Sequence, residues 1–481
     1  MNKVAKNYFY NLIYRILTLI LPFITTPYIS RVLNPEGIGA YNYTLSVVNV
    51  FILIASLGTA MYAQSEIAFC GSDRTERNKV FSEILLIRII TSVLISVVYI
   101  VMSFKSEKYM YLFMAQYICI VANMIDISWL FQGVEDFKKT ATRGIVIKLL
   151  SVLAIFLFVR TKDDVVIYTL ICATSTLFNA LVLWFFASRI VDFQIPSWKR
   201  AKKHLRPVFL LFLPVTATYV YTYIDKIVLG MLSTESEVGF YSQSENMVKL
   251  AMTVITSLGT VLLPRISKLI GNNEKEEVRN EVMRAIKFVV TWGLPMTVGL
   301  ALIASIFVPW FLGENYAPCI LLIEVLSVLI VIIGLSSVTG QAVLVPMKKQ
   351  NIYTLSIVAG AIANIIANFS LIPRYGALGA AIGTIIAELI VNFIQQVVVY
   401  KIISINIVDV LNNNKKNIFA TIIMAVTLHV IKSQFTASVI GTILFAAIGV
   451  AVYIAFLLLF KDDSVNFALD AMKNRYIRRR K

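Results

Sequence analysis

The sequence has few charged residues and few residues of metal or thiol chemistry for its length. Only 15% of its 481 residues are charged, whereas 58% are hydrophobic and the mean hydropathy is +0.79. Soluble domains carry about a quarter charged residues. These figures exclude a soluble globular enzyme, a disordered chain and a secreted disulfide scaffold, and they indicate a polytopic membrane protein.

Cysteine and histidine are scarce. The four cysteines, at positions 70, 119, 172 and 319, show no paired spacing, and the two histidines are His204 and His429. We therefore expect no metal site, no thiol-redox site and no bound cofactor.

Catalytic motifs are also missing. The sequence has no GxxxxGK[ST] phosphate loop and no recognisable Ser/His/Asp set. The longest loops between apolar stretches, near 189–207 and 267–285, are too short to fold as a separate catalytic domain. We therefore expect a protein that is not an enzyme.

Long apolar runs dominate what is present. A bilayer core needs roughly 20 apolar residues per helix, and the runs are too uniform for the alternation of a membrane barrel. Fourteen such stretches lie near 9–30, 39–62, 80–103, 109–131, 144–160, 166–188, 208–231, 244–266, 286–307, 318–338, 350–371, 378–400, 416–432 and 437–460. The predicted fold class is an all-α polytopic membrane protein with 14 transmembrane helices.

The basic residues predict the orientation of these spans. An even number of spans places both termini on one side, and most lysines and arginines outside the spans lie on that side. The seven on the other side are Arg31, Lys105, Lys108, Arg160, Lys162, Arg374 and Lys432. Cytoplasmic loops are enriched in Lys and Arg, so both termini are predicted inside. This rule accounts for most of the net charge of +17 without nucleic acid. The basic run KRAKKHLR at 199–206 is also suited to attract anionic lipid.

An internal repeat divides the chain. Residues 21–43 and 213–242 each contain Leu-Pro within a predicted helix, a short acidic loop, then Gly39 or Gly239 before an aromatic pair. The repeat predicts two halves of six helices each, in the same orientation. The expected divisions are an N-lobe at 1–198, a basic cytoplasmic linker at 199–207, a C-lobe at 208–400, and two extra helices with a tail at 401–481. Parallel repeats are one route to alternating-access transport.

Three prolines interrupt the predicted helices of the repeat. Pro22, Pro27 and Pro214 each remove a backbone donor and tend to kink a helix. Packing kinks and a hinge in the same helix of each half are both consistent with this pattern.

Charged residues within the spans are the main candidate functional groups, because each costs several kcal/mol in the bilayer. In the first half, Arg15, Arg88, Asp126 and Lys148 fall in the inner third of the membrane. In the second half, Asp225, Lys226, Glu245 and Lys249 fall near the outer end, and the last two are i,i+4 neighbours. Neutralised structural pairs, such as Arg88 with Asp126, are one interpretation. The second interpretation is a cavity with cationic patches that accept an anionic head group. Glu324 and Glu388 also lie within predicted spans, and the sequence does not show which way they face.

Polar and aromatic residues accompany the outer charges. Tyr219 and Tyr223 lie one turn apart, and Gln243 and Asn246 open the next span. Aromatic faces with amide donors suit a sugar, although tyrosine also populates membrane interfaces in general.

Four stretches together resemble a known family. They are 21–43, WLFQGVEDFKKTATRG at 129–144, 213–242, and NIIANFSLIPRYGALGAAIGTIIAE at 364–388. The sequence resembles the Wzx-type polysaccharide flippases of the MOP superfamily, which also holds the MATE multidrug exporters and the lipid II flippases. The resemblance implies alternating-access movement of an undecaprenyl-pyrophosphate-linked oligosaccharide from the inner to the outer leaflet of the bacterial cytoplasmic membrane.

The resemblance also implies roles for individual residues. The cations matched to the pyrophosphate-binding cavity are Arg15, Arg31, Arg88, Lys148, Lys226 and Lys249. The resemblance places this cavity centrally, between two six-helix lobes. From the residues themselves, the candidate sugar contacts are Tyr219, Tyr223, Gln243 and Asn246. The candidate residues for coupling to H+ or Na+ are Asp126, Asp225 and Glu245. Membrane lipid, a polysaccharide polymerase and chain-length machinery are the expected partners. A lipid II-type flippase, a multidrug antiporter and a glycan polymerase are the alternatives.

Overall fold

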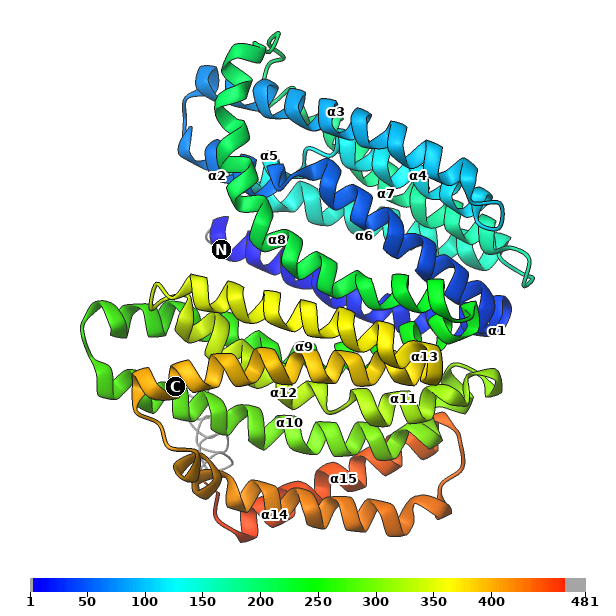
Figure 1. The fold of residues 1–481 in the computed structure, drawn as a ribbon, viewed down its shortest axis with the longest axis vertical. Helices are drawn as coiled ribbons and strands as arrows, with labels where there is room; N and C mark the ends of the chain where they lie inside the picture. Colours follow the sequence, from blue (N-terminus) through cyan, green and yellow to red (C-terminus); the bar gives the residue numbers. More distant parts are fainter. Residues whose placement is uncertain (1–2, 463–481) are drawn as a thin grey trace, which may run out of the picture. The chain divides into compact units, whose positions relative to one another are not determined.

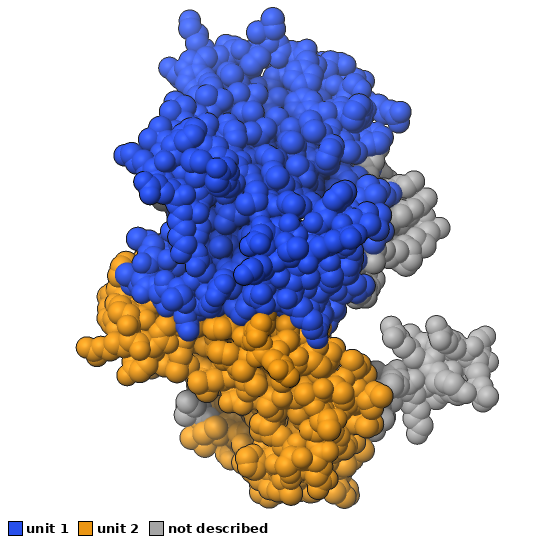
Figure 2. All heavy atoms as spheres, turned by 90° about the vertical axis from the view of Figure 1, so that its right-hand side faces the viewer, with its two compact units in different colours: residues 1–239 blue, residues 240–481 orange. Residues whose placement is uncertain are grey.

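The computed structural model describes the backbone of residues 3–462. It describes the side chains of these residues except 3–20, 137–141, 211, 213–215, 217–218, 220–221, 260–261 and 407. Within this part of the chain every regular element is a helix. The chain divides into two compact units, residues 1–239 and 240–481 (Figure 2).

Unit 1 holds eight α-helices and the start of a ninth, in the part that the structure describes. They are α1 (Lys3–Ser56), α2 (Thr59–Phe69), α3 (Arg74–Lys105), α4 (Met110–Ile125), α5 (Ser128–Gly133), α6 (Phe137–Phe158), α7 (Val165–Ala187), α8 (Trp198–Leu232) and the first turn of α9 (Glu235–Gly271). Helix α4 packs on α1, α3 and α7, and α8 packs on α1, α2 and α3 (Figure 1).

Unit 2 holds the rest of α9 and the later helices. These are α10 (Lys275–Phe311), η1 (Glu314–Tyr316), α11 (Pro318–Leu326), α12 (Leu329–Ser336), the π-helix η2 (Ser337–Leu344), α13 (Gln350–Ile403), α14 (Ile407–Ile431), η3 (Lys432–Gln434) and α15 (Val439–Leu459). Helices α14 and α15, orange to red in Figure 1, lie side by side and pack on α10. Ala420, Phe445 and Tyr453 form the centre of this contact.

The described residues contain ten helices long and apolar enough to cross a membrane, which establishes a multi-pass membrane protein. Each of the fourteen stretches expected from hydropathy is largely helical, but 39–62, 109–131 and 318–338 each cross from one helix into the next. Two helices, α1 and α13, carry two predicted spans each, because the chain leaves helical geometry at Asn34 (φ 57°) and Gly376 (φ 54°). The full count of fourteen and the two six-helix lobes remain predictions.

The units do not divide the chain at the predicted linker. Helix α8 contains the basic run 199–206 and packs within unit 1, because its contacts are with α1, α2 and α3. The two units are defined by which helices contact each other, whereas the two predicted lobes are defined by the sequence repeat. The predicted lobes at 1–198 and 208–400 therefore stay a prediction.

The kink in α1 lies beyond its first two prolines. Asn34 precedes Pro35, and a residue before proline is pushed out of helical geometry. Pro22 and Pro27 lie within continuous helix, so the described chain breaks after them. The side chain of Pro214 lies outside the described residues.

Two further helix breaks lie in unit 1. Helix α1 gives way to α2 through Leu57 and Gly58, both with positive φ, and α4 gives way to α5 at Asp126. The short helices α2 and α5 then pack together. A Cβ on Gly133 of α5 would lie 2.7 Å from the Ile67 side chain of α2, so the crossing requires glycine.

Candidate functional site

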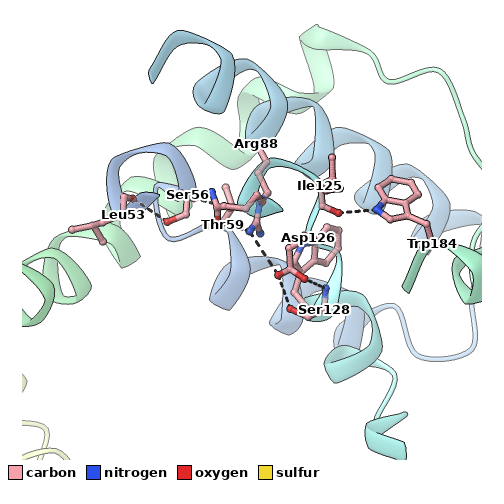
Figure 3. A network of polar contacts seen from close by, with 10 residues as sticks. Leu53, Ser56, Thr59, Arg88, Ile125, Asp126, Ser128 and Trp184 are labelled. Atoms are coloured by element: carbon pink, nitrogen blue, oxygen red, sulfur yellow. Dashed lines mark hydrogen bonds and ion pairs between the residues drawn. The ribbon is translucent and has the colours of Figure 1, made fainter. Parts of the chain in front are cut away.

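Arg88 is buried in the interior of unit 1, where α3 passes the broken α4. Its Nε donates to the backbone oxygen of Asn123 at 2.7 Å, and its Nη2 donates to Asn123 Oδ1 at 2.8 Å. Its ion pair with Asp126 is longer, 3.8 Å from Nη2 to Oδ2, and only 3% of the Arg88 side chain is exposed (Figure 3). Arg88 and Asp126 therefore form the pair that the sequence indicated, with Asn123 as the nearer partner.

The Asp126 carboxylate also bonds to the first residue of the next helix, α5. Its Oδ1 accepts from the Ser128 backbone N–H at 3.1 Å and its Oδ2 from the Ser128 hydroxyl at 2.7 Å (Figure 3). These bonds form an Asx turn one residue before Ile127, the N-cap of α5. At the end of α4, Ile125 O accepts from the Trp184 indole at 2.8 Å. The helix ends exposed by the break are thus bonded within the protein, as membrane-embedded breaks require.

The other predicted cations of the first half do not join this pair in the described contacts. Lys148 is exposed on α6, and Arg31 is exposed on α1, where its Nη1 donates to Pro27 O at 3.0 Å. The side chain of Arg15 lies outside the described residues. Of the predicted inner group, the structure therefore brings together Arg88 and Asp126.

Two predicted charges on α8 are buried. Asp225 is 4% exposed and Lys226 is 8% exposed. On the same helix the rings of Tyr219 and Tyr223 lie 5.8 Å apart. Tyr219 is 40% exposed, so its face is accessible to a partner.

Helix α9 carries the predicted pair of unit 2. Lys249 Nζ lies 2.7 Å from Glu245 Oε1, which confirms the pairing expected from their i,i+4 spacing. The Lys249 side chain is 39% exposed, so this ammonium is accessible while paired. Gln243 is buried and Asn246 is exposed, so these two predicted sugar-binding residues differ in accessibility.

The two acidic turns of the sequence repeat meet within unit 1. A Cβ on Gly39 would collide with the backbone of Glu235, and one on Gly239 would collide with the backbone of Pro35. The Glu235 carboxylate also accepts from Tyr109 at 3.0 Å and pairs with Lys108 at 2.8 Å. The hydrogen bond that Lys108 donates to Glu235 raises the pKa of Lys108, because the carboxylate favours the charged ammonium.

Sequence reasoning missed two important side chains. Asn123 holds Arg88 more closely than Asp126 does, and an amide one turn before the acid was the available signal. Glu83 is buried on α3 within an apolar stretch, yet it was not counted among the charges inside spans. Both are polar residues in predicted spans, but only charged residues deep in a span were considered.

An apolar cavity of about 310 Å³ lies in unit 2, between α10, α14 and α15. Trp292, Met296, Met424, Phe445 and Tyr453 are among the residues that line it. Its lining suits hydrocarbon and does not suit a phosphate or a sugar.

Comparison with known sequences places these features in a family. The profile of the family described as "Polysaccharide biosynthesis protein" matches residues 4–270, more than half of the chain. A protein named "Putative O-antigen transporter" from Shigella dysenteriae is 26% identical over 79% of this chain and 96% of its own length. The capsular polysaccharide biosynthesis protein CapF of Staphylococcus aureus is 22% identical over 80% of this chain and 97% of its own length.

Solved structures share the fold. The lipid II flippase MurJ in an inward closed conformation matches with a TM-score of 0.76 at 17% identity, covering 94% of this chain and 99% of that chain. An inward-facing MATE multidrug resistance transporter of the MOP superfamily matches with a TM-score of 0.61 at 15% identity, covering 80% and 98%. The fold, the membrane-spanning helices and the profile match agree, and the chain therefore belongs to the polysaccharide biosynthesis protein family, with the fold of the MOP superfamily.

Proposed function

We propose that this protein flips undecaprenyl-pyrophosphate-linked oligosaccharide repeat units from the inner to the outer leaflet of the bacterial cytoplasmic membrane. The observation that carries the proposal is the set of charged side chains held within helices that are apolar enough to span a bilayer. Arg88, Asp126, Glu245 and Lys249 all belong to such helices. Charges of this kind mark a pathway for a polar cargo through a membrane.

The proposed architecture is fourteen spans in two parallel lobes, with both termini in the cytoplasm. Alternating access between the lobes moves the head group across the membrane. The pyrophosphate is held by cations from the set Arg15, Arg31, Arg88, Lys148, Lys226 and Lys249. The oligosaccharide contacts Tyr219, Tyr223, Gln243 and Asn246.

The proposed cations differ in how accessible they are to a phosphate in the conformation described. Lys249 is accessible and paired by a single carboxylate, so a phosphate can replace Glu245 as its partner. Arg88 is buried and bonded to Asn123, so it supports the helix break in this conformation. We therefore propose Lys249 as the first residue to test for contact with the pyrophosphate.

The lipid tail of the cargo remains in apolar surroundings. The cavity between α10, α14 and α15 offers such surroundings within unit 2. We propose that transport is driven by a gradient of H+ or Na+, that no enzymatic step occurs, and that a polysaccharide polymerase and chain-length machinery use the product. Asp126, Asp225 and Glu245 are the proposed coupling residues.

The names of its relatives favour a surface glycan as the source of the cargo over lipid II. The relatives include an O-antigen transporter and a capsular polysaccharide protein, whereas the likeness to MurJ is one of fold. A lipid II flippase is required for cell-wall growth. Deletion of this gene is therefore expected to abolish the surface polymer and leave growth intact.

The experiment that tests the proposal locates lipid-linked oligosaccharide in a strain that lacks this protein. Complete units trapped in the inner leaflet, and released by the wild-type gene, are the expected result. A polymerase would instead leave single units in the outer leaflet. Units that reach the outer leaflet and polymerise normally would overturn the proposed function.

A further inference from the structure

His204 lies buried at the junction of three helices of unit 1, and the proposed site does not use it. It belongs to α8, and it is 1% exposed. Its Nε2 lies 3.0 Å from Oε2 of Glu83 on α3, and its Nδ1 lies 2.7 Å from the Tyr62 hydroxyl on α2. A single imidazole thus connects α2, α3 and α8.

The charges around this imidazole nearly balance. Glu83 also pairs with Arg200 (Nε–Oε1 3.0 Å) and Lys203 (Nζ–Oε2 3.5 Å), both on α8. The Glu66 carboxylate of α2 is a second negative charge near the Tyr62 hydroxyl. Two carboxylates therefore face two cations. Since Arg200 and Lys203 are more than half exposed, water screens their charges from the ring.

Both protonation states of the ring satisfy this arrangement. When His204 is neutral, Nε2–H donates to Glu83 and Nδ1 accepts from Tyr62. When His204 is charged, Nδ1–H donates to the Tyr62 oxygen and the Tyr62 hydroxyl turns to Glu66. Neither state leaves a buried ring nitrogen without a partner, which would cost about 1–3 kcal/mol. Histidine is also the side chain that commonly changes charge near neutral pH.

We infer that His204 is a proton-binding site and that its proton controls how firmly α2 is tied to α8 and α3. This inference rests on the proposed flipping function for its role in transport. Hydrogen bonds that involve a charged group are roughly twice as strong as neutral ones. Proton binding therefore tightens the junction, and proton release loosens it.

The protonation of His204 is expected to affect helices α2 and α5, because of where the junction lies. Helix α2 follows the break at Leu57 and Gly58, and it packs on α5, which follows the break at Asp126. The two short helices are joined to the longer ones through non-helical residues. A change in the hydrogen bond of Tyr62 is therefore expected to move α2 and α5 before it moves the longer helices. Proton release from His204 weakens the hold of α8 on this α2–α5 pair, on the predicted cytoplasmic side.

The proton site is tested directly by the ring signals of 15N-histidine in the full-length protein in lipid nanodiscs. The chain has two histidines, so the variant His429→Gln assigns the His204 signals. Between pH 5 and 8.5 the His204 signals should titrate. Tyr62→Phe should lower the midpoint, because the charged ring loses a stronger hydrogen bond than the neutral ring does. Tyr111→Phe, on an exposed tyrosine, should leave the midpoint unchanged.

A His204 ring that stays in one protonation state over this range would overturn the proton site. An equal midpoint in wild type and Tyr62→Phe would overturn the junction. Neither result depends on transport, so the titration decides on the site even if the proposed function fails.

The role in transport is tested by the pH profile of flipping in proteoliposomes. The probe is the lipid-linked oligosaccharide extracted from the parental strain. Wild type is expected to flip at rates that change across the His204 titration, and His204→Gln, which retains a donor and an acceptor, is expected to flip at a pH-independent rate. A variant that keeps the wild-type profile would show that the proton does not control the cycle.

Discussion

The Arg88 guanidinium donates two hydrogen bonds to Asn123, at 2.7 and 2.8 Å, while its ion pair with Asp126 spans 3.8 Å. The arginine therefore binds the end of α4 more closely than it binds the acid that follows. A guanidinium is suited to this task because its donors point in fixed directions. Arg88 holds the broken helix together in the conformation described here.

Removal of Arg88 is expected to destabilise unit 1. Arg88→Met leaves the end of α4 and the Asp126 carboxylate without their cation, and loss of one partner from a buried pair costs about 3 kcal/mol. Arg74→Met on the same helix is the control, because its ion pair with Asp192 is exposed and contributes less than about 1 kcal/mol. Thermal unfolding of the purified variants measures both. An Arg88→Met protein with wild-type stability but no glycan export would assign Arg88 to the cargo instead.

Lys249 is expected to matter for transport more than for folding. Its pair with Glu245 is part-exposed, so Lys249→Ala should change the free energy of unfolding by less than about 1 kcal/mol. Glycan export should fall at least tenfold, and further in Lys249→Glu, because the pyrophosphate loses a cation. Lys268→Glu, on an exposed lysine of the same helix, should export normally. Equal export by the two charge reversals would exclude Lys249 from the site.

The contact between the repeated acidic turns requires glycine. Gly39→Ala places a methyl group against the Glu235 backbone and is expected to cost about 1–3 kcal/mol through overpacking. Gly271→Ala is the matched control, since its Cβ would meet nothing within 4 Å. Differential scanning of the two variants measures the difference, and equal melting temperatures would mean that the turns separate at no cost.

The Lys108–Glu235 pair gives a pH dependence of known sign. Because the pKa of Lys108 is raised in the folded protein, its contribution to stability is fully present below about pH 10.5. The contribution disappears as the pH rises through the raised pKa. Wild type and Glu235→Gln should therefore differ in melting temperature at pH 8 and converge at high pH. A difference that persists there would assign the effect of Glu235 to its bond with Tyr109 alone.

The sequence predicted the helices well because membrane burial imposes a simple rule on length and hydropathy. Every predicted span is largely helical, and the Glu245–Lys249 pair follows from helical spacing alone. The breaks within spans were less predictable. Leu57 carries a positive φ with no proline beside it, because packing of α2 on α5 stabilises a conformation that its own sequence does not favour.

The candidate site was predicted only at the level of residue type. The depth argument found Arg88 and Asp126 but missed Asn123 and Glu83, because neutral amides cost little in a span and Glu83 lies near its end. His204 was interpreted as part of a basic loop, whereas the fold buries it against Glu83. Contacts between residues far apart in the chain require the three-dimensional arrangement, which spacing does not contain.

The proposed function requires that this chain alone moves a lipid-linked oligosaccharide across the membrane. The most direct measurement reconstitutes the purified protein in liposomes that carry the oligosaccharide lipid in both leaflets, and follows how much of it an external glycosidase reaches. Liposomes with the wild-type protein should lose nearly all of the intact lipid, while those with Lys249→Glu should retain about the protected half that protein-free liposomes retain. Protection by the wild-type protein equal to that of empty liposomes would contradict the account.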